Sequence, residues 1–248
     1  MKITYIYNSG FMVETQECLL IFDCYRGING PFPKDGCLEE GDIIRNNVYV
    51  FASHSHPDHF NKNIFKWAEA NPKIKYIFSH DIKPGSAKLP GVKFMDEGQS
   101  YSDKNLLVKV FGSTDEGVSF MVRLDGQNIF HAGDLNMWHW KDECPAGESQ
   151  GYIDAFYNEI DKLKNEWASP ISLAFFPVDP RLGTDYYEGA VYFAKQLSPK
   201  YLVPMHFGGN FDKAAAARAD IEAQGVIYVQ PKKYGDVIDP DLPLTWDI

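Results

Sequence analysis

The order of the expected elements predicts an α+β fold in which helices are layered over two packed sheets. The first half of the chain is rich in short β-type runs, whereas the second half alternates helices with strands. Hydrophobic residues make up 44% of the 248 residues and aromatic residues 15%, so the chain can bury a sizeable core. No segment has the composition of a linker between domains, and we therefore expect residues 1–248 to form a single domain.

Short apolar runs bounded by turn residues predict the strands of the first half. The run NVYVFAS is apolar almost throughout, as expected of a strand covered on both faces. A Gly- and Pro-rich segment at 25–36 predicts a surface loop that could serve as a lid. Asp125-Gly126 favours a hairpin between two strands. The expected strands are residues 3–7, 11–14, 18–23, 47–53, 74–79, 92–95, 106–112, 118–124 and 128–133, and residues 63–70 are an expected helix.

The second half changes to an alternation of helical and extended patterns. Helical periodicity recurs between short apolar runs, which is typical of strands joined by helical crossovers. We expect helices at 151–167, 185–197 and 213–224, and strands at 171–178, 201–205 and 226–230.

The charge balance is acidic, with 34 Asp and Glu against 24 Lys and Arg and a net charge of −10. Proteins that bind a phosphate backbone usually carry a basic face, so we expect no nucleic-acid partner. The first twenty residues lack the pattern of a signal peptide, and no apolar run approaches the roughly 20 residues that cross a bilayer. We therefore expect a cytoplasmic protein with no membrane partner. In a reducing compartment, free thiols are expected at Cys18, Cys24, Cys37 and Cys144.

The segment FASHSHPDHF at 51–60 holds three of the seven histidines. It directly follows an expected strand, where residues two apart point to the same side, so His54 and His56 can reach one metal ion together. Pro57 restricts the backbone and the chain then bends, so Asp58 and His59 can point toward a second ion. Imidazole and carboxylate ligands suit zinc, manganese or ferrous iron. The alternative is an exposed polar loop.

The pattern His-x-His-x-Asp-His after a strand resembles the signature of the metallo-β-lactamase fold superfamily. Gly133-Asp134 follows a later expected strand and His206 follows another, in the order found in that family. The resemblance extends from about residue 3 to about residue 230. It implies a four-layer αβ/βα sandwich of the metallo-β-lactamase type with a metal site at one edge. The order of the motifs is more similar to the lactonase-like branch than to the antibiotic-degrading one.

The same resemblance implies a ligand set. One metal position would take His54 and His56, and the other would take three residues, with a carboxylate bridging both ions. A bridging anion screens the repulsion between two dications a few ångströms apart. We expect one or two ions, zinc first, with Mn²⁺ or Fe²⁺ as alternatives. The second position would comprise Asp58, His59 and His206, and the bridging residue would be Asp134.

One expected ligand is missing. The family usually places another histidine after the strand that here ends near Gly112, where this chain reads VFGSTDEG at 110–117. Asp115 could supply an oxygen ligand instead, which would favour harder ions such as manganese. Alternatively, the first position holds metal weakly, or a distant residue such as His139 completes it.

Three further residues are candidates for substrate binding. Ser113 is either a substrate contact or weak metal ligand, or an ordinary polar turn residue. Asp115, named above as a possible metal ligand, is otherwise a turn or cap residue. His139 lies between two tryptophans and either contacts the substrate or belongs to a packed aromatic cluster. Arg181 either holds an anionic group or pairs with a neighbouring aspartate.

These residues predict a metal-dependent hydrolase. A bound metal ion lowers the pKa of water from about 16 to about 7, and Asp58 could orient or deprotonate that water. The expected substrate is a small ester, lactone or phosphoester of an anionic or sugar-derived molecule. The alternatives are a phosphodiesterase or nuclease of the same fold, and a metal-binding sensor or scaffold that has lost catalysis. The Tyr- and Phe-rich helices would also tolerate a homo-oligomer interface.

Overall fold

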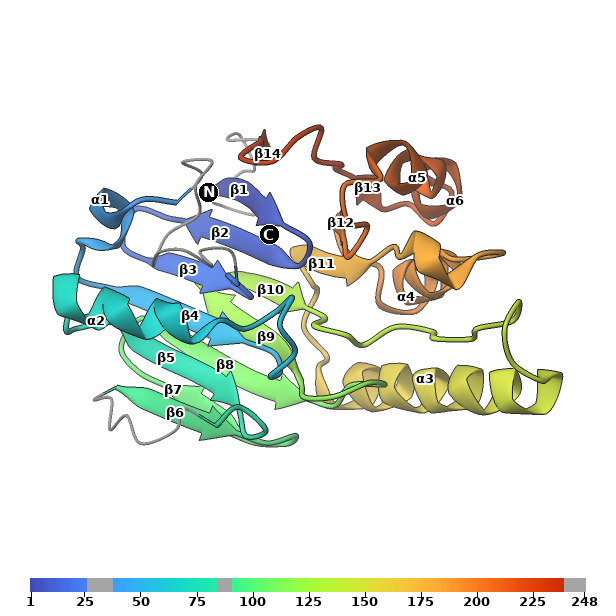
Figure 1. Ribbon diagram of the computed structural model, residues 1–248, viewed down its shortest axis with the longest axis horizontal. Helices are drawn as coiled ribbons and strands as arrows, with labels where there is room; N and C mark the ends of the chain where they lie inside the picture. The colour runs from blue at the N-terminus through green and yellow to red at the C-terminus, as the bar shows by residue number, and fades with distance from the viewer. Residues whose placement is uncertain (26–37, 84–90, 239–248) are drawn as a thin grey trace. The chain divides into compact units, whose positions relative to one another are not determined.

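The computed structural model describes residues 1–25, 38–83 and 91–238 (Figure 1). The chain divides into two compact units: unit 1 comprises Met1–Asp96 and Pro231–Ile248, and unit 2 comprises Glu97–Gln230. Each unit contains one seven-stranded mixed sheet with its own helices, which confirms the predicted α+β class. The expected loop at 25–36 lies almost entirely outside the described residues. Cys37 lies outside them as well. That the whole chain acts as one domain stays a prediction.

The sheet of unit 1 has the strand order β14-β1-β2-β3-β4-β5-β6. The pairs from β14 to β3 are antiparallel, whereas β3, β4, β5 and β6 run parallel to one another. The strands are β1 (Lys2–Tyr7), β2 (Gly10–Glu14), β3 (Leu19–Phe22), β4 (Val48–Ala52), β5 (Lys75–Ser79), β6 (Val92–Met95) and β14 (Val237–Ile238); the helices are α1 (Glu40–Ile43), the 3-10 helix η1 (Lys62–Lys66) and α2 (Trp67–Ala70).

The sheet of unit 2 has the order β13-β12-β11-β10-β9-β8-β7. Here the pairs from β7 to β10 are antiparallel, and β10 to β13 run parallel. The strands are β7 (Ser100–Ser102), β8 (Leu106–Phe111), β9 (Ser119–Leu124), β10 (Gln127–His131), β11 (Leu173–Pro177), β12 (Tyr201–Met205) and β13 (Ile227–Tyr228); the helices are α3 (Ala146–Glu166), the 3-10 helix η2 (Pro180–Leu182), α4 (Glu188–Leu197), α5 (Phe211–Ala216) and α6 (Arg218–Glu222).

The two sheets therefore share one topological pattern. In each, three antiparallel pairings are followed by three parallel ones, so β3 in unit 1 corresponds to β10 in unit 2. Successive parallel strands have their carboxyl ends at the same edge of a sheet, where loops and side chains can converge. The residues after β3, β4, β10, β11 and β12 are therefore placed to build functional sites.

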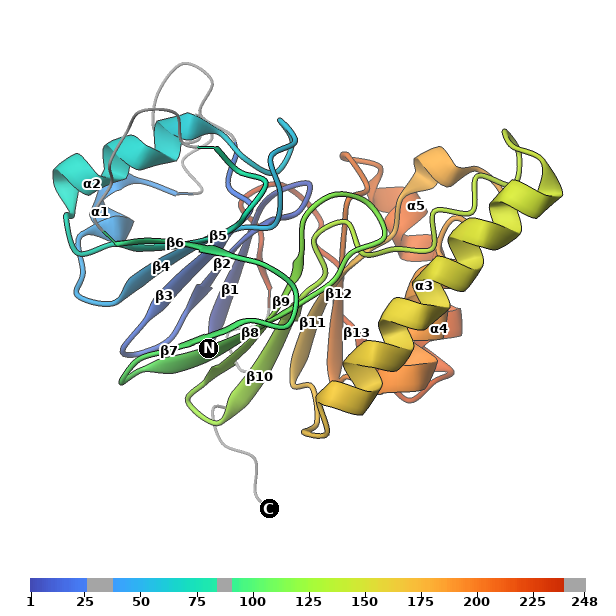
Figure 2. The ribbon, with the colours of Figure 1, turned by 90° about the horizontal axis from the view of Figure 1, so that it is seen from below.

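Helices bury apolar side chains against each sheet within its own unit. In unit 1, α1 and α2 lie on the same face of the sheet (Figure 2), and the Trp67 side chain is 1% exposed. In unit 2, α3 and α4 lie on one side of the sheet. Phe193 of α4 stacks on Phe130 of β10 and Phe176 of β11, with ring centroids 5.4 and 4.5 Å apart. Such stacked aromatic pairs add to the stabilisation from burial.

The sequence predicted most elements and misplaced several boundaries. All five residues of β4 are buried, as expected of a strand covered on both faces. The expected helix at 213–224 is two short helices, α5 and α6, and the expected helix at 63–70 begins as the 3-10 helix η1. Helix α3 begins at Ala146, five residues before its expected start at 151. Strands β7 and β14 were not expected, since each has only two or three residues.

Two further expectations concern the membrane and the cysteines. Within the described ranges, no helix is long and apolar enough to cross a membrane. Among the described residues, Cys18, Cys24 and Cys144 form no disulfide.

The hairpin between β9 and β10 generates a stability prediction. Asp125 and Gly126 have φ values of 51° and 74°, the left-handed pair of a type I′ turn. A Cβ at Gly126 would meet nothing within 4 Å, so Gly126→Ala tests backbone strain alone. We expect this variant to lower the free energy of unfolding by about 1–2 kcal/mol. Gly151→Ala is the matched control within α3, where a Cβ also meets nothing. We expect it to raise the free energy of unfolding by about 0.5–1 kcal/mol. Urea denaturation measures both, and equal shifts would contradict the turn assignment.

Candidate metal centre

The histidine-rich loop leaves the carboxyl end of β4 in unit 1. The imidazole rings of His54 and His56 lie 4.6 Å apart between centroids, in keeping with the expectation that they point to the same side. The chain then turns, because the backbone N–H groups of His59 and Phe60 both donate to the carbonyl of His56, at 3.0 and 2.9 Å. The N–H of Ser55 donates to the Asp81 carboxylate at 2.7 Å, which anchors the loop to the segment after β5.

A buried carboxylate, that of Asp23, holds this loop in place through hydrogen bonds. Asp23 directly follows β3 and is 1% exposed. Its oxygens accept hydrogen bonds from the backbone N–H of Ser53 at 2.7 Å, from the Ser53 hydroxyl at 2.7 Å and from His59 Nδ1 at 2.7 Å. The Ser53 oxygen lies 3.0 Å from His54 Nδ1. One carboxylate and one hydroxyl thus contact both buried histidines of the loop.

This network assigns the proton on each ring. An ionised carboxylate only accepts hydrogen bonds, so His59 must carry its proton on Nδ1. Since the Ser53 hydroxyl donates to Asp23, its oxygen accepts from Nδ1 of His54. In both rings Nε2 is then the nitrogen that can offer a lone pair to a metal ion. The histidine ligands of metal sites are commonly oriented in this way by a partner on the other ring nitrogen.

Asp58 lies beside these nitrogens. Its carboxylate accepts a hydrogen bond from the Asn8 side chain at 3.2 Å and lies 3.7 Å from His59 Nε2. Ligand atoms of Asp58 and His59 lie within 4.8 Å of each other, as do those of His54 and His59. Unit 1 therefore brings together four of the predicted ligands: His54, His56, Asp58 and His59.

Unit 2 brings together a second set at the carboxyl ends of β10 and β12. His206 Nε2 lies 3.3 Å from Asp134 Oδ1, and both side chains are almost fully buried. Gly133, with φ of 56°, gives the turn that precedes Asp134. His206 itself has φ of 63°, a left-handed conformation that is uncommon for residues other than glycine. Strained backbone of this kind is found preferentially at functional sites.

A second buried carboxylate orients His206. Asp179 follows β11, is 1% exposed, and accepts a hydrogen bond from His206 Nδ1 at 2.9 Å. Arg181 donates to the same carboxylate from Nε and Nη2, at 2.9 and 2.6 Å. Burial acts to raise the pKa of Asp179, but the hydrogen bonds from His206 and Arg181 prevail and hold that pKa below its usual range. The ionised Asp179 fixes the proton of His206 on Nδ1 and turns Nε2 toward Asp134.

Asp115 lies near this second set. A carboxylate oxygen of Asp115 lies within 4.8 Å of one from Asp134, although Asp115 is exposed. Its backbone N–H donates to the Ser113 hydroxyl at 3.3 Å, which is the polar turn that was the alternative interpretation of Ser113. The position therefore suits the predicted oxygen ligand, and the ligand role stays a prediction.

The two remaining candidates have structural partners. His139 is fully buried; its Nδ1 accepts from the backbone N–H of Lys141 at 3.2 Å, and its Nε2 lies 3.3 Å from the carbonyl of Asp185. This arrangement favours the packing alternative over substrate contact. Arg181 pairs with Asp179, as its alternative interpretation expected, yet 64% of its side chain stays exposed. Its substrate-binding role also stays a prediction.

Sequence reasoning did not predict that three residues of these networks orient the histidines. Asp23 and Ser53 come directly after a strand of wholly apolar sequence, and Asp179 comes one residue after another such strand. A carboxylate or hydroxyl at the end of a buried strand was the available signal, because such a group must find hydrogen-bond partners when it is buried.

The donor set fits a metal ion. Histidine Nε2 atoms and carboxylate oxygens suit Zn²⁺, Mn²⁺ and Fe²⁺, and carboxylates orient the rings of His59 and His206 as in known metal sites.

The sequence matches the family described as Beta-lactamase superfamily domain over residues 2–206. A protein of Desulforamulus reducens named UPF0173 metal-dependent hydrolase is 24% identical over 230 residues, covering 84% of each chain. Among solved structures, a metallo hydrolase from Ignicoccus hospitalis has a TM-score of 0.65 at 19% identity, covering 95% of this chain and 96% of that one. A diiron β-hydroxylase from Streptomyces venezuelae has a TM-score of 0.65 at 10% identity, covering 94% and 53%. The likeness to these structures is one of fold.

The carboxylate–histidine pairs generate a prediction on metal affinity. We expect Asp23→Asn and Asp179→Asn each to weaken metal binding by about 10–100-fold, because the imidazole loses its fixed proton and orientation. Competition with a chromogenic chelator measures the affinity, and circular dichroism checks that each variant folds. Asp103→Asn is the control, since Asp103 caps a turn beside β7 and contacts neither histidine. Unchanged affinity in both folded variants would contradict the orienting role.

Proposed function

We propose that this chain, which belongs to the beta-lactamase superfamily domain family, is a metal-dependent hydrolase that binds its metal through the two ligand sets described above. Membership in the family confirms the predicted fold of the metallo-β-lactamase type. The relatives named metal-dependent hydrolases support the same activity for this chain.

One observation carries the proposal: the histidines that follow β4 and β12 are held by buried carboxylates in a state that offers Nε2 to a metal. Burying Asp23 and Asp179 costs free energy unless each is fully hydrogen-bonded. Metal-ligating histidines commonly have such a carboxylate hydrogen-bonded to the other ring nitrogen, and His59 and His206 each have one. All these residues follow parallel strands, where α/β sheets usually bind their ligands.

We propose that both sets bind one centre of one or two ions. One position would use His54 and His56, with Asp115 in place of the histidine that the sequence lacks. The other would use Asp58, His59 and His206, and Asp134 would bridge the two. Zinc is the first expectation; the number of carboxylates also suits Mn²⁺ or Fe²⁺.

The chain's own groups then have separate tasks. When bound, such an ion lowers the pKa of a coordinated water and polarises the bond to be cleaved. Asp58 is half-buried and held by Asn8, so it can accept a proton from a water at the centre and pass it to the leaving group. The Asp23 and Asp179 carboxylates hold the imidazole rings in place throughout and exclude the wrong tautomers.

The proposed substrate is a small ester, lactone or phosphoester, with Ser113 and Arg181 as candidate contacts. The predicted absence of nucleic-acid and membrane partners, the cytoplasmic location and the homo-oligomer all stay predictions.

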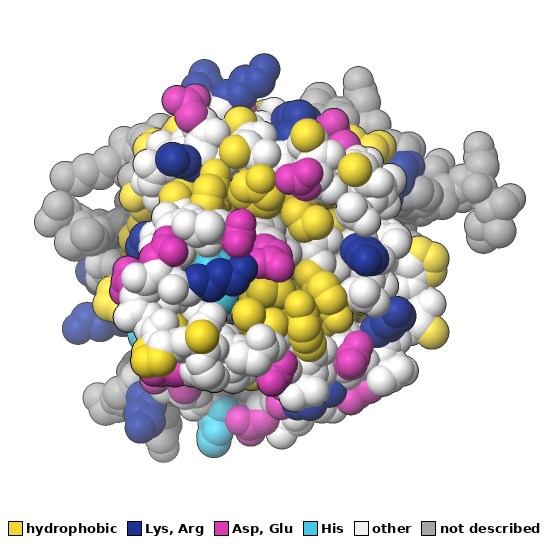
Figure 3. Space-filling view, turned by 90° about the vertical axis from the view of Figure 1, so that its right-hand side faces the viewer, with side chains coloured by type: hydrophobic (Ala, Val, Ile, Leu, Met, Phe, Trp, Pro, Cys, Tyr) yellow, Lys and Arg dark blue, Asp and Glu magenta, His cyan; other side chains and the backbone are white. Residues whose placement is uncertain are grey.

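A nuclease of the same fold is the second candidate, and charge is its weakness. On the face drawn in Figure 3, Lys and Arg side chains are interspersed with Asp and Glu and with hydrophobic groups. The net charge of −10 points the same way, since phosphate-backbone binding favours a concentrated basic surface. A sensor or scaffold without catalysis is the third candidate, motivated by the histidine missing near Ser113.

Chelation provides the direct test of the proposed activity. We expect protein purified without added metal to carry about one or two equivalents of a transition metal, measured by elemental analysis. Dialysis against a chelator should abolish turnover of a generic lactone and a generic ester, and the native metal should restore it. Faster turnover of a generic phosphodiester than of either would favour the nuclease, and a metal-loaded protein without any turnover would favour the sensor.

A pair of variants tests whether the two ligand sets serve one centre. We expect His59→Ala and His206→Ala each to lower metal affinity by at least about 100-fold, because each removes an oriented nitrogen ligand. The double variant should lose little more than either single one, since ligands of one centre are not additive. His80→Ala is the control, because His80 is exposed and pairs with Asp96. Independent, additive losses would mean two separate sites.

A further inference from the structure

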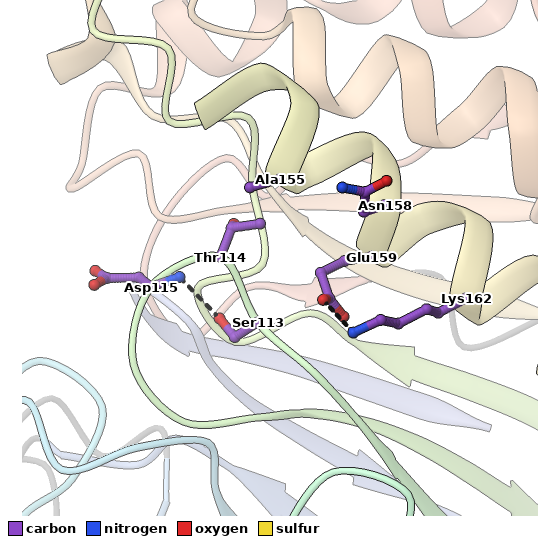
Figure 4. A pocket seen from close by; sticks show the side chains of 7 residues that line it. All are labelled: Ser113, Thr114, Asp115, Ala155, Asn158, Glu159 and Lys162. Carbon is purple, nitrogen blue, oxygen red and sulfur yellow. Dashed lines mark hydrogen bonds and ion pairs between the residues drawn. The ribbon is translucent and has the colours of Figure 1, made fainter. Parts of the chain in front are cut away.

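A cavity of about 590 Å³ lies within unit 2 beside Asp115. Its size falls within the range of small-molecule sites. One wall is the loop that follows β8, and the other is one face of α3, whose lining residues recur at helical spacing. Figure 4 shows the lining side chains: Ser113, Thr114, Asp115, Ala155, Asn158, Glu159 and Lys162.

The loop wall is fixed to the segment that carries Asp134. The Thr114 hydroxyl donates to the carbonyl of Asn136 at 2.6 Å and accepts from the N–H of Asn136 at 2.9 Å. Asp115 lines the cavity and also has a carboxylate oxygen within 4.8 Å of one from Asp134. A molecule that has its reacting bond at Asp134 can therefore extend directly into the cavity.

The helix wall carries an unequal balance of charge. The Lys162 ammonium pairs with Glu159 at 2.7 Å and with Glu97 at 3.0 Å, and these hydrogen bonds raise the pKa of Lys162. Two carboxylates, Glu159 and Glu97, thus share this one ammonium, which leaves one negative charge in excess. Asp115 adds a further carboxylate at the edge of the cavity, pointing away from α3 (Figure 4). An anionic group in the cavity would meet uncompensated negative charge, and like charges in close contact are strongly disfavoured.

The carboxylates of Glu159 and Glu97 both lie close to Gly112. A Cβ at residue 112 would collide with the Glu159 carboxylate and closely approach that of Glu97. Glycine at position 112 thus leaves room for the end of the Glu159 side chain beside the loop. The Asn158 amide and the Ser113 hydroxyl also line the cavity and can hydrogen-bond hydroxyl and amide groups.

We infer that this cavity is the specificity pocket of the proposed hydrolase, taking an uncharged, hydroxyl- or amide-bearing group of the substrate and rejecting an anionic one. The inference rests on the proposed function for its placement beside the reacting bond. It favours a sugar-derived substrate over an anionic molecule of the same size.

A matched series of substrates tests this selectivity. The probes are p-nitrophenyl esters with acyl chains of equal length that end in a hydroxyl, a carboxylate or a trimethylammonium group. We expect the carboxylate ester to have a kcat/KM about tenfold or more below that of the hydroxyl ester, with the trimethylammonium ester not disfavoured. Glu159→Gln should reduce this difference in kcat/KM between the hydroxyl and carboxylate esters by about threefold or more. The substitution removes one carboxylate and leaves Lys162 with one partner.

Glu166→Gln is the matched control. It removes the same charge two turns along α3, where Glu166 pairs with Lys109 outside the cavity. The gap between the hydroxyl and carboxylate esters should stay unchanged in this variant. Equal narrowing in Glu166→Gln and Glu159→Gln would mean a general charge effect and would overturn the inference, as would equal turnover of all three esters by the unaltered protein.

A binding measurement separates this inference from the proposed function. Ala155→Trp should fill the cavity, with metal content unchanged. Ligand-observed NMR would follow the N-methyl amides of the same three acyl chains, whether or not any ester is turned over. We expect the hydroxyl amide to bind the unaltered protein and to bind Ala155→Trp at least about tenfold more weakly. Binding unaffected by Ala155→Trp, or no binding at all, would overturn the pocket; turnover without metal dependence would instead overturn the proposed function.

Discussion

The geometry of the site depends on one constraint, which is that a buried carboxylate must use its lone pairs. Asp23 meets this constraint with the Ser53 backbone, the Ser53 hydroxyl and His59, and Asp179 meets it with His206 and Arg181. Each histidine is thereby held in one tautomer and one orientation. The rings would otherwise rotate between several hydrogen-bonding states, and the metal-facing nitrogen would be defined only after a metal had bound.

The position of these carboxylates follows from the topology. In each unit the sheet changes from antiparallel to parallel pairing, at β3 in one and at β10 in the other. Asp23 follows β3 and Asp134 follows β10; the histidine loop follows β4 and Asp179 follows β11. The correspondence indicates that both ligand sets are built on the same structural plan, with different side chains at equivalent strand ends. No short sequence repeat reveals it, because the shared property is strand order, and apolar strands of different sequence satisfy it equally well.

The sequence predicted what depends on local chemistry. The hairpin at Asp125-Gly126 follows from the left-handed backbone of the turn, and the buried strand β4 follows from its unbroken apolar run. The His-x-His-x-Asp-His segment is equally local, and the turn from His56 to Phe60 matches its expected bend. By contrast, Asp23 and His59 are 36 residues apart in the sequence, and Asp179 and His206 are 27 apart. The residues around each carboxylate therefore do not indicate which distant histidine it will bind. The short strands β7 and β14 were missed for the same reason, since pairing partners rather than their own residues define them.

The residue that departs most from the family pattern also gives the site its electrostatic character. Asp115 lies in the segment after β8, where the family usually has a histidine, and its carboxylate adds a negative charge beside Asp134. Without a cation, two carboxylates at this separation repel one another, which raises the free energy of the metal-free protein and increases its affinity for a dication. Asp115 also lies at the edge of the cavity beside α3, where Lys162 pairs with both Glu159 and Glu97 and one carboxylate is in excess. In its proposed role as a ligand, Asp115 would favour a harder metal ion and disfavour an anionic substrate together, because both preferences respond to one local potential.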